Sequence, residues 1–160
     1  MKKLILLAAF FTAGTTINQA GAQLKVNINL NIESQPVWGP AGYDYVQYYY
    51  MPDIDVYYYV PTHRYVYLDK GHWIFSAYLP VRYRNYNMFN TYKVVINEPR
   101  AYEHHSVHVI KYQKYKGNNG KQVIIRNSAD PKYVAVNAKY RKENERKEND
   151  KKGNENHKKE

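Results

Sequence analysis

Apolar and polar residues alternate without a break from Leu24 to Ile32. Leucine, valine or isoleucine occupies every even-numbered position of this segment, and one lysine and three asparagines occupy the positions between them. A period of two residues is typical of a strand that buries one face and exposes the other. The pattern therefore predicts a half-buried strand over this segment.

A block rich in tyrosine follows, with 14 of the 19 tyrosines between Tyr43 and Tyr92. Tyr48–Pro52 reads Tyr-Tyr-Tyr-Met-Pro, and Tyr57–Pro61 repeats the phrase nine residues later with valine in place of methionine. Aromatic and β-branched residues favour strands, while proline and the sequence Asp-Lys-Gly at Asp69–Gly71 favour turns. The block predicts an antiparallel β-meander with the strands Tyr43–Tyr50, Val56–Val60, Arg64–Leu68, His72–Tyr78 and Tyr92–Asn97.

The chain after the meander carries signals of helices and turns. Ala101–Lys116 favours a helix, although Val107–Ile110 within it is equally compatible with an extended strand. Gln122–Arg126 predicts a short strand. Asp130 and Pro131 predict a helix start, since aspartate caps a first turn and proline fits inside it.

The composition changes at Lys139. Residues 139–160 hold nine basic and six acidic side chains and, apart from Tyr140, nothing to bury. Such a segment cannot offset the entropy of ordering by burying apolar surface. The sequence therefore predicts a charged, disordered C-terminal tail.

The first residues have the pattern of an export signal. Lys2 and Lys3 precede the apolar run Leu4–Phe11, and Ala20-Gly21-Ala22 is a small-x-small cleavage site. The alternative, a membrane anchor, needs roughly 20 apolar residues, about twice this run. We therefore expect a signal peptide over residues 1–22, a single β-rich domain over residues 23–138 and the tail over residues 139–160.

Composition narrows the classes of function. The formal net charge is +10, and the chain contains no cysteine. A disulfide, a thiol nucleophile and a lipid-modified cysteine are therefore excluded. A basic exported protein suits anionic polysaccharide or lipopolysaccharide, the alternative being that the charge serves solubility alone. Periplasmic or extracellular residence would separate the chain from intracellular nucleic acid, so we do not expect that partner.

One cluster carries possible metal chemistry. On a helix, His104 and His108 lie one turn apart on the same face, the spacing of a two-nitrogen metal clamp. His105 stands where the zinc-protease motif requires glutamate. The alternative is that the three histidines are polar surface residues, and we expect no cofactor.

The carboxylates and tyrosines give weaker signals. Asp53 and Asp55 could act as a glycosidase pair, but we favour the alternative that they cap the turn after Pro52, which needs only local hydrogen bonds. Alternation in Val56–Val60 places Tyr57 and Tyr59 on one face, which we expect to point outward. Exposed tyrosines could stack on sugar rings, with cations beside them holding anionic groups, or they could simply form the scaffold. The candidate binding residues are Tyr57, Tyr59, Arg64, Arg82 and Arg84.

Several phrases together resemble a known group of proteins. They include Trp38-Gly39-Pro40, the paired Tyr-Tyr-Tyr-x-Pro runs, Gly71-His72-Trp73-Ile74 and Tyr92-Lys93-Val94-Val95-Ile96-Asn97. In these residues, over roughly 37–133, the chain resembles an uncharacterised family of small tyrosine-rich exported proteins of Gram-negative bacteria. The resemblance implies a shared fold and no catalytic residue.

Together these features predict an α+β protein, mainly β, with one short helix. Its expected function is that of an exported, non-catalytic binding or structural protein of the envelope or matrix, contacting anionic glycan or lipid through a sheet face rich in tyrosine and arginine. The alternative is a metal-handling protein or hydrolase centred on His104, His105 and His108.

Processing is the first testable prediction. The small-x-small site predicts cleavage before Gln23, so mass spectrometry of the exported protein should show a chain that begins there. Recovery of an envelope-associated chain with Met1 intact would contradict the assignment.

Overall fold

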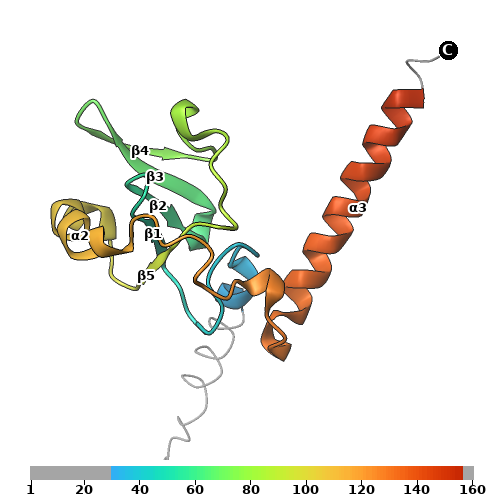
Figure 1. Cartoon of the computed structure of the whole chain (residues 1–160), viewed down its shortest axis with the longest axis horizontal. Helices are drawn as coiled ribbons and strands as arrows, with labels where there is room; N and C mark the ends of the chain where they lie inside the picture. The colour runs from blue at the N-terminus through green and yellow to red at the C-terminus, as the bar shows by residue number, and fades with distance from the viewer. Residues whose placement is uncertain (1–29, 157–160) are drawn as a thin grey trace, which may run out of the picture.

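A computed structural model describes residues 30–156 and places a five-stranded antiparallel sheet at the centre of the fold (Figure 1). The sheet order is β4-β3-β2-β1-β5, so the first four strands form a meander and the fifth returns to pair beside β1. This confirms the predicted α+β class with an antiparallel meander. The strands are β1 Tyr48–Met51, β2 Val56–Tyr59, β3 Arg64–Asp69, β4 His72–Ser76 and β5 Val94–Ile96.

Turn chemistry fixes the register of the meander. Asp69 pairs with His72 across a two-residue turn. Lys70 and Gly71 both have positive φ, 48° and 80°, as a tight hairpin whose twist matches its strands requires. The proline-containing turn between β1 and β2 brings Met51 opposite Val56. The turn positions were therefore predictable from local sequence.

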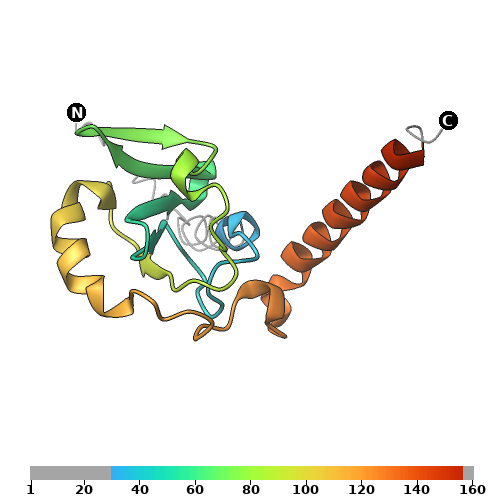
Figure 2. The same cartoon turned by 45° about the horizontal axis from the view of Figure 1, so that its top comes forward.

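Helical turns occupy most of the chain outside the sheet. The segment predicted as helix over residues 101–116 consists of η3, α2 and η4, and α3 extends away from the body (Figures 1 and 2). Asp130 accepts a hydrogen bond from the Lys132 backbone N–H at 3.0 Å, and Pro131 opens the first turn, so the predicted helix start is confirmed. The bounds are η1 Val60–Thr62, η2 Val81–Tyr83, η3 Ala101–His104, α2 His105–Tyr112, η4 Gln113–Tyr115, η5 Ile125–Asn127, η6 Pro131–Tyr133 and α3 Val134–Asn156.

The predicted strand Leu24–Ile32 is wrong where the structure describes it, because residues 30–34 form a helical turn. Its remaining positions, 24–29, lie outside the described residues. Asn31 explains the difference: its side-chain amide accepts the Val46 N–H at 2.7 Å and donates to the Val46 carbonyl at 2.8 Å. A side chain thus pairs with the entry to β1 where the pattern predicted a backbone strand.

The predicted strand Gln122–Arg126 is also wrong. Only a single bridge forms there, between Ile124 and Pro40, and η5 begins at the next residue. The Ile125 N–H donates to the Gly39 carbonyl and the Arg126 N–H to that of Val37, both at 2.9 Å. The segment therefore packs against a loop, and no neighbouring strand is available to extend the bridge.

The C-terminal region differs from the predicted disordered tail, since α3 runs from Val134 to Asn156. Its base is anchored, with Tyr133 fully buried and Val136 nearly so. The described side chains beyond Tyr140 are almost all exposed, and the spacing of Glu143 and Lys147 favours helix without tertiary contacts. Within residues 30–156, no helix is both long and apolar enough to span a membrane.

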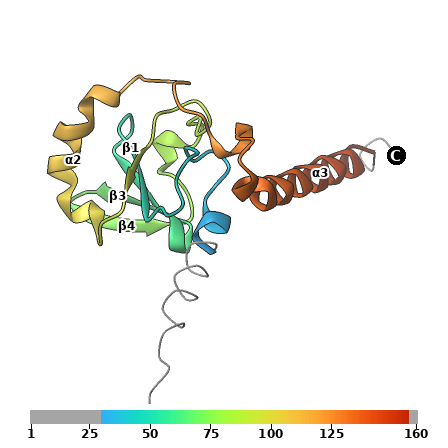
Figure 3. The ribbon, with the colours of Figure 1, turned by 90° about the horizontal axis from the view of Figure 1, so that it is seen from below.

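Both faces of the sheet are covered. The face that α2 covers, here called the helix face, is built from Tyr48, Tyr50, Tyr57 and Val66. The opposite face, here called the loop face, includes Tyr49, Met51, Val56 and Tyr58, and the segment 79–88 packs against it. Figure 3 shows α2 lying along one side of the strands. Tyrosine therefore fills two cores rather than one.

Five of the tyrosines packed in the cores have a hydrogen-bond partner for their phenol hydroxyl. An unpaired buried hydroxyl costs roughly 1–3 kcal/mol, so these bonds decide which segments pack together. The bonds join Tyr49 to Gln35 at 3.0 Å, Tyr50 to Asp55 at 2.8 Å, Tyr57 to His108 at 2.9 Å, Tyr86 to Asp53 at 3.1 Å and Tyr133 to the Tyr43 carbonyl at 3.2 Å.

The buried phenols predict steep alkaline unfolding. Burial raises the pKa of Tyr48 to about 12 and those of Tyr49, Tyr50 and Tyr57 further above the ordinary value of 10. Above pH 10 the unfolded chain loses protons that the folded chain keeps, so stability falls as pH rises. Each such tyrosine contributes about 1.4 kcal/mol per pH unit in this window.

Tyrosinate absorbance and far-ultraviolet circular dichroism, followed together from pH 9 upward, test this prediction. Ionisation of the buried class should coincide with loss of the β-sheet signal. Ionisation of all tyrosines near pH 10 with the sheet intact would contradict it.

Candidate functional site

The structure brings His104 and His108 to one carboxylate. Their ring centroids lie 6.4 Å apart. His104 Nδ1 lies 3.5 Å from Glu98 Oε1, and His108 Nε2 lies 2.9 Å from the same oxygen. Glu98 lies two residues beyond the end of β5, and its carboxylate meets His104 at the end of η3 and His108 in the first turn of α2. Sequence reasoning did not identify Glu98 as the partner.

Both ring nitrogens of His108 have a polar partner. Nδ1 pairs with the Tyr57 hydroxyl at 2.9 Å while Nε2 faces Glu98, and the side chain is only 6% exposed. Burial lowers the pKa of His108, and the Glu98 carboxylate opposes that shift. A metal ion at His108 would have to displace Tyr57 or Glu98. Within residues 30–156, no group of three or more histidine or acidic side chains is arranged to hold a metal ion.

His105 belongs to a different environment. Its ring packs 5.5 Å from Trp73 and 6.1 Å from Tyr57, centroid to centroid. Its Nε2 is buried and has no hydrogen-bond partner among the described residues. Burial lowers the pKa of His105, which favours the neutral ring. The three histidines therefore do not form one site, and the network Tyr57–His108–Glu98 fastens α2 to the sheet.

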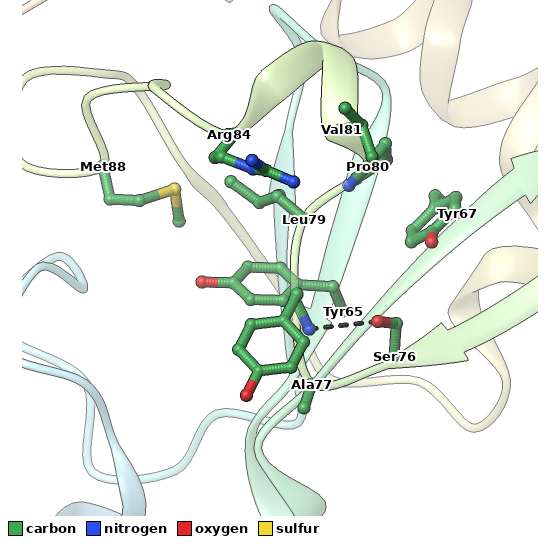
Figure 4. Close-up of a pocket in the computed structure, with 10 residues that line it drawn as sticks. Tyr65, Tyr67, Ser76, Ala77, Leu79, Pro80, Val81, Arg84 and Met88 are labelled. Carbon is green, nitrogen blue, oxygen red and sulfur yellow. Dashed lines mark hydrogen bonds between the residues drawn. The ribbon is translucent and has the colours of Figure 1, made fainter.

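A second feature is a groove of about 720 Å³ on the loop face (Figure 4). Strand β3 contributes Tyr65 and Tyr67, and the segment after β4 contributes Tyr78. Ser76 Oγ accepts the Tyr78 backbone N–H at 3.0 Å and so holds the turn at the groove's edge. The full lining is Tyr65, Tyr67, Ser76, Ala77, Tyr78, Leu79, Pro80, Val81, Arg84 and Met88, and we call it the tyrosine groove.

The tyrosine groove carries positive charge. Arg84 lies in its lining, which contains no aspartate or glutamate. Arg82, on the adjoining η2, has its guanidinium 4.9 Å from the ring centre of Tyr83. Burial raises the pKa of Tyr65, which keeps its phenol protonated as a donor. The groove thus offers aromatic faces, hydroxyl donors and a cation in one surface.

A buried lysine braces one wall of this groove. Lys93 Nζ donates to the carbonyls of Met88 and Thr91, the latter at 2.8 Å, and lies 5.7 Å from the ring centre of Trp38. Burial lowers the pKa of Lys93 to about 8. Because Met88 lines the groove, this bonding fixes the position of its wall.

The predicted binding residues do not form one surface. Tyr57 is fully buried and Tyr59 half-buried on the helix face, so the expectation that they point outward is wrong. The physical reason is that η3 and α2 cover that face. Arg64 is exposed opposite Tyr59 in the register, whereas Arg82 and Arg84 belong to the loop-face segment.

The groove tyrosines were missed, although a signal for them existed. Tyr65 and Tyr67 alternate around buried Val66, the same period-two pattern that drew attention to Tyr57 and Tyr59. Tyr78 is 80% exposed, the largest value among the exposed tyrosines. The pattern identified tyrosine rows correctly but not which row a helix covers.

No protein family, curated protein or solved structure matches the chain.

Replacement of His108 tests the structural role of the network. His108→Ala should lower the free energy of unfolding by about 2–4 kcal/mol, because it leaves the Tyr57 hydroxyl without its partner beside a cavity. His104→Ala is the matched control: its side chain is 61% exposed, so we expect a change within about 0.5 kcal/mol. Urea denaturation measures both. Similar losses for the two variants, or stoichiometric zinc binding that requires both histidines, would contradict this role.

Proposed function

We propose that this chain is an exported, non-catalytic binding protein of the bacterial envelope or matrix. It holds anionic polysaccharide, including the glycan of lipopolysaccharide, in the tyrosine groove. This retains the kind of function expected from the sequence and moves its site to Tyr65, Tyr67, Tyr78 and Arg84.

The observation that carries the proposal is the composition of the groove. Three tyrosines and one arginine share a concave surface that has no carboxylate in its lining. Tyrosine rings offer an apolar face to the C–H surface of a sugar ring, while their hydroxyls remain available for hydrogen bonds. The guanidinium of Arg84 suits a carboxylate or phosphate, which it can hold through two parallel N–H bonds.

Charge over the whole chain supports an anionic ligand. The formal net charge is +10 for the whole chain, and +8 once Lys2 and Lys3 are removed with the signal peptide. This positive charge favours encounter with a polyanion, and the attraction depends on ionic strength. The signal-peptide pattern at the N-terminus supports export to the compartments in which such polymers occur. The groove therefore adds short-range contacts to a long-range attraction.

The same geometry favours binding over hydrolysis. A glycosidase places two carboxyl groups on either side of the scissile bond, and the groove lining provides none. His108, the most buried member of the histidine cluster, is bonded to Tyr57 and Glu98 on the opposite face of the sheet. The alternative of a hydrolase or metal-handling protein thus lacks a supporting arrangement in these residues.

Retention on an immobilised uronic acid polymer tests the proposal, with a neutral glucan as the comparison. Tyr78→Ala should weaken retention roughly tenfold through loss of stacking. Arg84→Gln should weaken it and reduce its salt dependence, since charge interactions are screened over about 8 Å at physiological ionic strength. Tyr45→Ala and Arg141→Gln are matched controls, because both side chains are exposed outside the groove.

Two results would contradict the proposal. One is retention that disappears in salt and is the same in Tyr78→Ala as in Tyr45→Ala, which would leave only nonspecific basicity. The other is equal retention on the neutral glucan, which would remove the role of Arg84.

A further inference from the structure

The two edges of the sheet differ in whether another segment of the chain covers them. At the β5 side, the amide of Gln122 accepts the Lys93 backbone N–H and donates to the Lys93 carbonyl, both at 2.8 Å. The Gly120 N–H also donates to the Asn90 carbonyl at 2.7 Å. Chain from the η4–η5 connection thus satisfies backbone groups next to β5 and runs past this side of the sheet (Figure 2).

The β4 side has no such cover. Strand β4 is the last in the sheet order, and its five residues pair only with β3. Within residues 30–156, no hydrogen bond joins its outer backbone groups to another segment. In Figure 2, β4 lies at the outside of the sheet with no other described element beyond it.

The sequence of β4 lacks the features that normally protect an open edge. Exposed edges are commonly blocked by charged residues, proline or a bulge. His72–Ser76 reads His-Trp-Ile-Phe-Ser, with no lysine, arginine, acidic residue or proline, and its pairing with β3 has no bulge. Ile74 is 36% and Phe75 43% exposed, although the chain carries a net charge of +10. The open edge is thus an apolar, uncharged strip on a basic molecule.

We propose that a second copy of this chain pairs with β4, antiparallel to it, about a twofold axis at Ile74. This register places Ile74 opposite itself, Trp73 opposite Phe75 and His72 opposite Ser76. Aromatic and β-branched pairs stabilise neighbouring strands, and no two like charges meet in the register. Elsewhere the basic surface would repel a second copy. Electrostatic repulsion therefore opposes self-association least at the uncharged β4 edge.

The helix face supports this register. Tyr102 lies 5.3 Å from Trp73 and 5.2 Å from Phe75, centroid to centroid. The Trp73–Phe75 pairs between copies would continue an aromatic cluster that already exists within one copy. A contact made by one short strand is smaller than the roughly 1,200 Å² of a stable interface, so the dimer is reversible and depends on concentration.

The symmetry has a consequence for the tyrosine groove, and this step alone rests on the proposed function. A twofold axis normal to a continuous ten-stranded sheet places the loop faces of both copies on the same side. Two grooves then face one polymer, and binding through both raises retention without any new contact.

The absence of cysteine makes a sharp experiment available. Ile74→Cys introduces a single thiol at the proposed axis, where it meets its own copy within disulfide range. Under mild oxidation this variant should form a covalent dimer at least about tenfold faster than Val123→Cys or Val134→Cys. Those two positions are 67% and 62% exposed, and they lie on the β5 side of the sheet and at the start of α3, so they report random collision. Cross-linking of Ile74→Cys no faster than these controls overturns the proposal.

Sedimentation velocity of the unmodified chain provides the second measurement. Its mean mass should rise with concentration, and Phe75→Lys should abolish the rise by placing a charge on each side of the axis. Circular dichroism and the melting temperature of Phe75→Lys show whether the fold is intact. A mass that stays monomeric, or a dimer that Phe75→Lys does not affect, overturns the proposal. Tyr78→Ala leaves β4 unchanged, so this variant should still dimerise. Polymer retention that Tyr78→Ala does not weaken would contradict the groove proposal alone, whereas loss of the concentration-dependent mass in the unmodified chain would contradict the dimer alone.

Discussion

A phenol hydroxyl cannot be buried without a partner, and this constraint positions the elements around the sheet. Tyr49 reaches Gln35 and so fixes the turn that precedes the sheet, while Tyr57 reaches His108 and fixes α2. Tyr133 places the base of α3 by the same means, because its hydroxyl accepts the Gly42 N–H at 3.0 Å and donates to the Tyr43 carbonyl. A core of leucine and valine would pack without such directional demands. The tyrosines therefore provide apolar volume and, through their tips, specify which segment covers each part of the sheet.

The meander could be predicted from sequence because its signals are local. Strand-forming residues and turn residues lie within a few positions of one another. The turn at Lys70–Gly71 depends only on these two residues adopting positive φ, not on any distant contact. The exposure of each face could not be predicted in the same way. Tyrosine is suited to a wet surface and to a core, so alternation separates Tyr57 from Tyr58 without showing which is outside. Both are buried: α2, about 50 positions away in sequence, covers Tyr57, and Trp38 packs 4.9 Å from Tyr58, centroid to centroid, on the loop face.

Side-chain amides contribute bonds at both segments that were predicted as strands but contain none of the five sheet strands. Asn31 bonds both backbone groups of Val46, 15 residues away, and Gln122 bonds both backbone groups of Lys93, 29 residues away. An amide carries one acceptor and two donor hydrogens, so it can satisfy a peptide unit as a neighbouring strand would. A sequence pattern records the apolar spacing of such a segment but not the distant backbone that its amide will meet. The wrong assignments thus fall where a single side chain replaces a ladder of backbone bonds.

The two faces of the sheet differ in how completely their tyrosines are covered, and this difference separates structure from function. On the helix face, Tyr57, His108 and Glu98 use one another's polar groups, which leaves little for a ligand. On the loop face, the covering segment is tied back by Lys93 to the carbonyls of Met88 and Thr91, so one wall of the groove is held in place. The segment cannot then close over Tyr65 and Tyr67 without breaking bonds to a buried ammonium group, which would be costly. A concave aromatic surface is thus kept open by the same kind of interaction that closes the opposite face: the hydrogen bonding of a buried polar side chain, Lys93 on one face and His108 on the other.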